Sequence, residues 1–110
     1  MEVYKALTDL AAELTSRGIP AALDPRDVDA PGAIVDLEEI GGGSTLCGAF
    51  NARATVYLVA PDNGRGLALA TLLDMYSKVE DLTTGAQTIE LALPETAPLP
   101  AFKLNPIDLI

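Results

Sequence analysis

A glycine-rich stretch with the single cysteine of the chain is the first place where the sequence could do chemistry. Residues 39–50 read EIGGGSTLCGAF and offer Ser44 and Cys47 as candidate nucleophiles. A nucleophilic serine or cysteine needs an activating base, and the chain contains no histidine. The acidic neighbours Glu38 and Glu39 disfavour the thiolate form of a cysteine. We therefore interpret Cys47 as a small apolar residue at the start of a strand.

The same stretch lacks the features of a phosphate-binding loop. A P-loop requires GxxxxGK followed by serine or threonine, because the lysine must reach the outer phosphates. GGGSTLCG contains no lysine, and the next basic residue is Arg53, inside a predicted strand. The flanking segments are both strands, whereas a P-loop joins a strand to a helix. We predict no nucleotide site, and we expect a hairpin tip that becomes ordered when a partner covers it.

Acidic residues cluster in three places where a metal ion or an acid–base pair could be held. Glu38 is followed by Glu39, Glu80 is followed by Asp81, and the stretch DPRDVD supplies three aspartates. DPRDVD lacks the alternating ligands, the glycine and the distant glutamate of an EF-hand loop. Surface acids without converging donors make a weak catalytic site. We interpret these acids as solvated loop residues and predict no catalytic residue, no metal and no cofactor.

The charge and composition of the chain argue against several classes of partner. Sixteen Asp and Glu against seven Lys and Arg give a formal net charge of −9 at pH 7. The basic residues are scattered singly, whereas nucleic acids and anionic membranes are bound by clusters of Lys and Arg. No apolar run approaches the about 20 residues that span a bilayer. We expect a reducing, cytoplasmic origin, because a lone cysteine forms no internal disulfide and the N-terminus lacks a signal-peptide pattern.

The 110 residues predict one domain, residues 1–110, which contains two helices. In residues 2–17, apolar residues recur at spacings of three and four, the pattern of an amphipathic helix. Gly18 and Pro20 end this helix. The second predicted helix covers residues 65–81. Its predicted apolar face consists of Leu69, Leu72, Leu73, Tyr76 and Val79.

Four segments alternate apolar and polar residues as strands do. Residues 33–40 and about 50–60 are predicted antiparallel neighbours, with the glycine stretch in their connection. Residues 87–93 and 101–105 form a second pair, and residues 19–23 suit a short edge segment. Short connections between consecutive strands favour an antiparallel sheet. The predicted fold is α+β, a mainly antiparallel four-stranded sheet with two helices packed on one face, in the order α-β-β-α-β-β.

This order of elements, together with several phrases of sequence, resembles the tail terminator family of neck proteins from long-tailed phages. The resemblance covers nearly the whole chain and begins with the amphipathic helix and a proline-bearing stretch, residues 19–32. It continues with the hairpin 33–60, which has GGGST at its tip and ends in the phrase NARATVYLVAPDN. A leucine- and alanine-rich helix over 65–79 and two closing strands within 87–105 complete it.

The resemblance implies a non-enzymatic structural protein of the virion tail and neck, assembled in the host cytoplasm. Such proteins form a hexameric ring that caps the tail tube, stops its polymerisation and presents a surface to the head. DNA passes through the bore without specific binding. The implied partners are further copies of the chain, the tail tube protein and a head-closure or connector protein, with no membrane. A charge of −9 per copy suits an acidic bore along which DNA slides.

Three sets of residues are candidate contacts in such a ring. The hairpin tip is the candidate segment for docking on a partner: Gly41, Gly42, Gly43, Ser44 and Thr45. Acids of the loops and the hairpin are candidates for lining the bore or facing the tube: Asp24, Asp27, Asp29, Glu38 and Glu39. The apolar tail is the candidate subunit contact: Ile107, Leu109 and Ile110. The alternative for the tail, and for the surplus leucines of the second helix, is that they complete the core of a single chain.

Three alternative functions stay open at this point. A head-closure or head–tail connector protein would bind portal-bearing heads and not tail tubes. A small cytoplasmic module that recognises a protein or a metabolite would act as a monomer or a dimer. A hydrolytic enzyme would use the aspartate cluster to hold Mg²⁺ or Mn²⁺.

Overall fold

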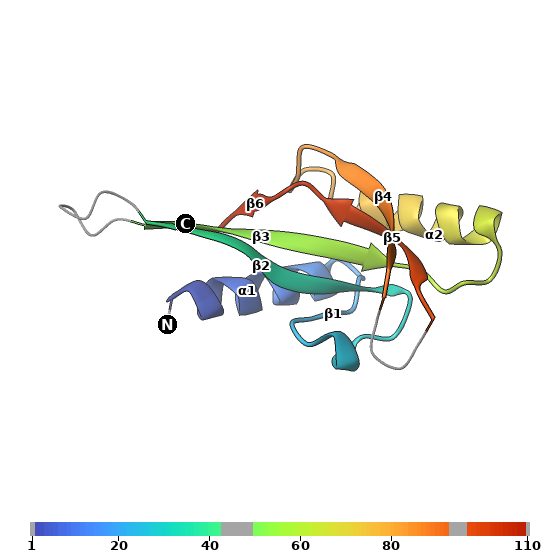
Figure 1. Ribbon diagram of the computed structural model, residues 1–110, viewed down its shortest axis with the longest axis horizontal. Coiled ribbons are helices and arrows are strands. Elements are labelled where there is room, and N and C mark those ends of the chain that lie inside the picture. The colour runs from blue at the N-terminus through green and yellow to red at the C-terminus, as the bar shows by residue number, and fades with distance from the viewer. Residues whose placement is uncertain (1, 43–49, 93–96, 110) are drawn as a thin grey trace.

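The computed structural model describes residues 2–42, 50–92 and 97–109, and Figure 1 shows how they are arranged. The elements in chain order are α1 (Glu2–Ser16), β1 (Ala21–Ala22), the 3₁₀ turn η1 (Pro25–Asp27), β2 (Gly32–Gly42), β3 (Phe50–Val59), α2 (Arg65–Ser77), β4 (Ala86–Leu91), β5 (Leu99–Leu104) and β6 (Ile107–Asp108). The predicted α+β class and the two helices are confirmed. The predicted count of four strands and the order α-β-β-α-β-β are wrong, because two further short strands join the sheet. Strands of two residues are too short to show a periodicity.

The strands form one open sheet that is mostly antiparallel. Their order is β1-β2-β3-β5-β4, and β6 pairs with β3 off this path. β1 runs parallel to β2, and the remaining pairs are antiparallel. β2 and β3 pair from Gly32↔Val59 to Gly42↔Phe50, and their far ends project beyond the rest of the sheet (Figure 1). We call residues 36–42 and 50–55 the arm. β6 pairs with its Arg53 and Ala54, and only the far end of the arm projects beyond β6 (Figure 1). The molecule measures 53 × 29 × 23 Å.

The main core lies on one face of the sheet, where side chains of both helices pack against alternate residues of β3. β3 contributes Ala52, Ala54, Val56 and Leu58. α1 contributes Val3, Leu7, Ala11 and Leu14. α2 contributes Ala68, Leu72 and Met75, and the turn after it contributes Val79. Phe102 and Leu104 of β5 complete this cluster. The buried stripe of α1 is the one that its apolar spacing predicts.

The buried face of α2 differs from the predicted one. Leu69 and Leu73 were expected in the core, but they are 44% and 52% exposed. Ala68 and Met75 are buried in their place, together with Leu72. The helix carries apolar residues on every side, so its sequence pattern does not select one face, and contact with the sheet makes the selection.

The opposite face of the sheet carries a second, smaller core under the loop that contains η1. Ile34, Val59 and Ala101 are buried there, and Val28 and Ala30 of the loop pack on them. By alternation, Ile34 lies on the opposite face of β2 from Ala33 and Val35 of the main core. It is buried because the loop covers the start of β2 on that side.

Gly32 lets the loop fit closely at the start of β2. A Cβ atom at this position would lie 2.8 Å from the backbone oxygen of Asp29 and 3.0 Å from that of Pro20. Backbone atoms cannot move aside as the end of a flexible side chain can, so a larger residue would displace the loop.

Arg17 joins the end of α1 to the turn after α2. Its guanidinium donates to both carboxylate oxygens of Asp81, at 2.7 and 3.2 Å, and to the backbone oxygen of Lys78 at 2.9 Å. A fourth hydrogen bond reaches the Glu13 carboxylate on α1 at 2.9 Å. The hydrogen bonds from Arg17 hold the pKa of the Asp81 carboxyl below its ordinary value, and those to Asp81 and Glu13 raise the pKa of Arg17. This paired geometry fixes the two helices relative to each other.

Candidate functional site

The five acids predicted to face a bore or a tube lie in two separate regions. Asp24, Asp27 and Asp29 belong to the loop before β2, whereas Glu38 and Glu39 lie on the arm. Six residues separate Gly32, where β2 begins, from Glu38, so the two regions are about 20 Å apart along the strand. The acids therefore form no single cluster, and their role in a ring stays a prediction.

Asp24 is occupied by contacts within its own loop. Its side chain accepts a hydrogen bond from the backbone nitrogen of Arg26 at 2.9 Å and so caps η1. It also forms an ion pair with the Arg26 guanidinium at 3.0 Å. The side-chain hydrogen bond from Arg26 is the main cause that lowers the pKa of Asp24. Asp27 and Asp29 are exposed.

Glu38 is placed by an irregularity in β2 that we did not predict from the sequence. The register of β2 against β3 shifts between Leu37 and Glu39, so Glu38 is the extra residue of a β-bulge. The Thr55 hydroxyl, which is fully buried, donates to the Glu38 carboxylate at 2.6 Å. Thr55 is the one buried polar or charged residue among the described positions. The bulge thus supplies the hydrogen-bond acceptor that a buried hydroxyl requires.

The arm has one acidic face and one apolar face. Glu39 pairs across the strands with Arg53, on the same side as Glu38 and Thr55. Leu37 and Ile40 pair with core-facing alanines of β3, yet they are 37% and 55% exposed. Exposed apolar side chains on a projecting hairpin are typical of a contact surface.

The outer edge of β2 along the arm has no strand partner among the described residues. β1 pairs only with Ala33 and Ile34, so the backbone from Val35 to Gly42 is unpaired on that side. Of the predicted tip residues, Gly41 and Gly42 are the last residues of β2. Gly43, Ser44 and Thr45 lie outside the described residues, as does Cys47.

The tail packs on its own chain. Ile107 and Leu109 are half-buried against the main core, and the Leu109 nitrogen donates to the Ala52 oxygen at 2.8 Å. β6, which contains Ile107, pairs with β3 at Arg53 and Ala54. Ile110 lies outside the described residues. The alternative that the tail completes a single core thus applies to two of its three residues, and a subunit contact through the tail stays a prediction.

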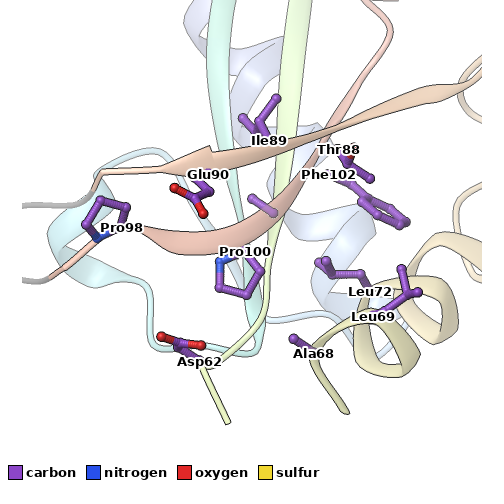
Figure 2. Close-up of a pocket in the computed structure, with 11 residues that line it drawn as sticks. Asp62, Ala68, Leu69, Leu72, Thr88, Ile89, Glu90, Pro98, Pro100 and Phe102 are labelled. Atoms are coloured by element: carbon purple, nitrogen blue, oxygen red, sulfur yellow. The ribbon is translucent and has the colours of Figure 1, made fainter. Parts of the chain in front are cut away.

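A groove that the sequence did not predict lies between α2 and the strands β4 and β5. Its volume is about 540 Å³. Leu69, Leu72 and Phe102 line its apolar part. Figure 2 shows Glu90 and Asp62 in the other part, near Pro98 and Pro100. The only sign of this groove in the sequence is the surplus of leucine in α2. A groove depends on which side chains remain uncovered after the elements pack, and the sequence does not specify this.

The described residues include no cluster of potential metal ligands. No three His, Cys, Asp or Glu side chains among them lie together as metal ligands would. The candidate nucleophiles Ser44 and Cys47 are not among the described residues. The described structure exposes apolar side chains on the arm, on α2 and in the groove.

Two further findings concern membrane-spanning segments and known relatives of the chain. Within the described part of the chain, no helix has the length and apolar character needed to cross a membrane. Comparison of the chain with protein-family models, with curated proteins and with solved structures finds no significant match.

Proposed function

We propose that this protein is a structural component of the neck of a long-tailed phage, a tail terminator whose copies form a hexameric ring on the end of the tail tube. The arm is the observation that carries the proposal. Its far end projects beyond the rest of the sheet, it keeps one strand edge unpaired by any described strand along Val35–Gly42, and it exposes Leu37 and Ile40. A hairpin with these three properties is suited to reach a neighbouring subunit or the tube.

The succession of elements supports the same proposal. The tail terminator pattern comprises an amphipathic helix, a proline-bearing stretch, a long hairpin with a glycine-rich tip, a second helix and closing strands. The described structure has a counterpart for each: α1, the segment with β1 and η1, the β2–β3 hairpin, α2, and the strands β4 and β5. A ring uses head-to-tail contacts, in which a projecting part of one copy meets a different surface of the next.

The charge of the chain supports a passage for DNA. With a net charge of −9 per chain, a closed ring would present an acidic bore. Like charges repel, so DNA would pass through without adhering. The acids on the arm, Glu38 and Glu39, and the exposed Asp27 and Asp29 are the candidates for this surface.

The test is capping of growing tail tubes. The purified protein is mixed with polymerising tail tube protein encoded by the same genome, and tube lengths are measured by negative-stain electron microscopy. We expect short tubes with an annulus at one end. The variant Ile40→Asp, on the apolar face of the arm, should lose capping, whereas Leu67→Asp, at an equally exposed leucine of α2, should retain it. Both variants should keep the wild-type melting temperature, because both side chains are exposed.

Tubes that grow to the same length with and without the protein, and that show no annulus, would refute the proposal. Binding to portal-bearing heads, with no binding to tubes, would favour a head-closure or connector protein. That result would keep the arm as the contact surface and change its partner.

A further inference from the structure

Strand β4 is a free edge of the sheet, and its one charged residue is Glu90. It pairs with β5 over all its residues, Ala86–Leu91, and with no other described strand. Its sequence AQTIEL contains neither lysine nor proline, and its register with β5 is regular, without a bulge. Natural edge strands commonly carry one of these features, which prevent another chain from pairing with them. An extended segment can therefore add to β4.

The groove between α2 and β4 lies beside this free edge. α2 packs over β3 and β5, and it leaves the helix-side residues of β4, Thr88 and Glu90, exposed. The wall of the groove on α2 includes Leu69, which is 44% exposed and therefore has apolar surface available. The side chains of an added strand that point toward the helix side would enter this groove.

The charges of the groove select the kind of segment that fits. Its two charged lining residues, Asp62 and Glu90, are both carboxylates, and no Lys or Arg is among the lining residues described. Both are exposed, and no ion pair within the described chain involves either of them. An apolar segment that carries a Lys or Arg complements this surface.

A second copy of the chain is a poor occupant by the same criterion. The exposed apolar residues of the arm, Leu37 and Ile40, are close in sequence to Asp36, Glu38 and Glu39. Docking of the arm in the groove would bring these acids toward the two carboxylates of the groove, and like charges oppose association.

We propose that α2, β4 and β5 form a docking groove for an extended, apolar segment of a different protein that carries a Lys or Arg. The segment adds as a strand to β4, places an apolar side chain against Leu69, and places its cation beside Glu90 and Asp62. This site is distinct from the arm and does not depend on ring formation.

The experiment selects peptides on the full-length protein. A phage-display library of random peptides is panned on the wild-type chain. The peptides are about ten residues long, which is the upper end of common strand lengths. Selected peptides are synthesised, and their affinity is measured by fluorescence anisotropy at low and high salt. We expect peptides that alternate apolar and polar residues and include a Lys or Arg. The backbone N–H groups of an added strand point alternately toward β4 and away from it. N-methylation of the set that faces β4 should abolish binding, whereas N-methylation of the other set should not.

Matched variants place the binding in the groove. Leu69→Ser should weaken binding by about tenfold or more, as truncation of a central contact does. Leu67→Ser, at an exposed leucine of the same helix outside the groove, should leave the affinity unchanged. The double variant Glu90→Gln with Asp62→Asn should weaken binding and also remove most of its salt dependence. Circular dichroism confirms that each variant is folded.

Three results would overturn the proposal: no peptide is enriched; the enriched peptides bind Leu69→Ser as tightly as the wild type; or they carry no basic residue. Concentration-dependent self-association that Leu69→Ser abolishes would identify a second copy as the occupant and would also overturn it. The capping assay uses Ile40→Asp on the arm, so the two proposals can fail independently.

Discussion

The hydrogen bond between Thr55 and Glu38 allows a quantitative test of how the arm is built. The Thr55 hydroxyl is fully buried and donates to the Glu38 carboxylate at 2.6 Å. The substitution Glu38→Ala removes the acceptor and leaves a buried donor without a partner. Such a group costs about 1–3 kcal/mol of unfolding free energy, with the lower value applying where water replaces the acceptor.

The partner substitution Thr55→Val should behave differently. Valine has the shape of threonine but no hydroxyl, and the exposed Glu38 carboxylate regains water. Replacement of a polar pair by apolar groups of the same shape is nearly neutral, so we expect a cost of about 1 kcal/mol or less. In the Thr55→Val background, Glu38→Ala should then cost about 0.5 kcal/mol or less, because no donor is left unpaired.

The assay is urea denaturation of the wild type, the two single variants and the double variant, followed by far-UV circular dichroism. Glu39→Ala is the control, since Glu39 is an exposed neighbour with no hydrogen bond among those that the described residues form. It should change the unfolding free energy by no more than about 0.5 kcal/mol. The reasoning fails if Glu38→Ala costs no more than Glu39→Ala, or if its cost is the same with valine at position 55.

Three further predictions concern the fold that carries the surfaces. Arg17→Ala should lower the melting temperature at neutral pH, because it removes the ion pair with Asp81. The folded state lowers the pKa of Asp81, so the stability that this ion pair contributes is present above about pH 4 and is lost as the pH falls through the folded-state pKa. Asp81→Asn should therefore lower the melting temperature less in acid than at pH 7. Gly32→Ala should lower the unfolding free energy by about 1–3 kcal/mol, because the new Cβ would meet backbone atoms. Gly66→Ala, where the helix has open space around the Cβ, should be neutral or stabilise by up to about 1 kcal/mol. Equal effects of the two variants in urea denaturation would contradict this. Leu72→Ala should cost about 2–5 kcal/mol in the same assay because Leu72 is buried in the main core, and a cost near that of an exposed site would show that α2 packs differently.

The sequence by itself determined the parts of the fold in which one periodicity has one solution. α1 has a single apolar stripe, so Val3, Leu7 and Leu14 had to face the core wherever the sheet lay. The two apolar segments on either side of the glycine stretch had to pair as a hairpin, because a short connection between two strands leaves antiparallel pairing as the simplest arrangement. The sequence also provided the net charge and the absence of histidine, on which the proposed function partly depends.

Only the tertiary structure decided which surfaces are free. α2 is apolar on every side, so the choice between Leu69 and Ala68 for the core depends on where the sheet meets the helix. The same choice leaves Leu69 exposed and creates the groove. The partner of Thr55 depends on a bulge, which shifts the strand register by one residue. Its only trace in the sequence is the spacing of three between Leu37 and Ile40, where strict alternation gives a spacing of two. Side-chain periodicity describes an element in isolation, whereas exposure is a property of the contacts between elements that are distant in the sequence.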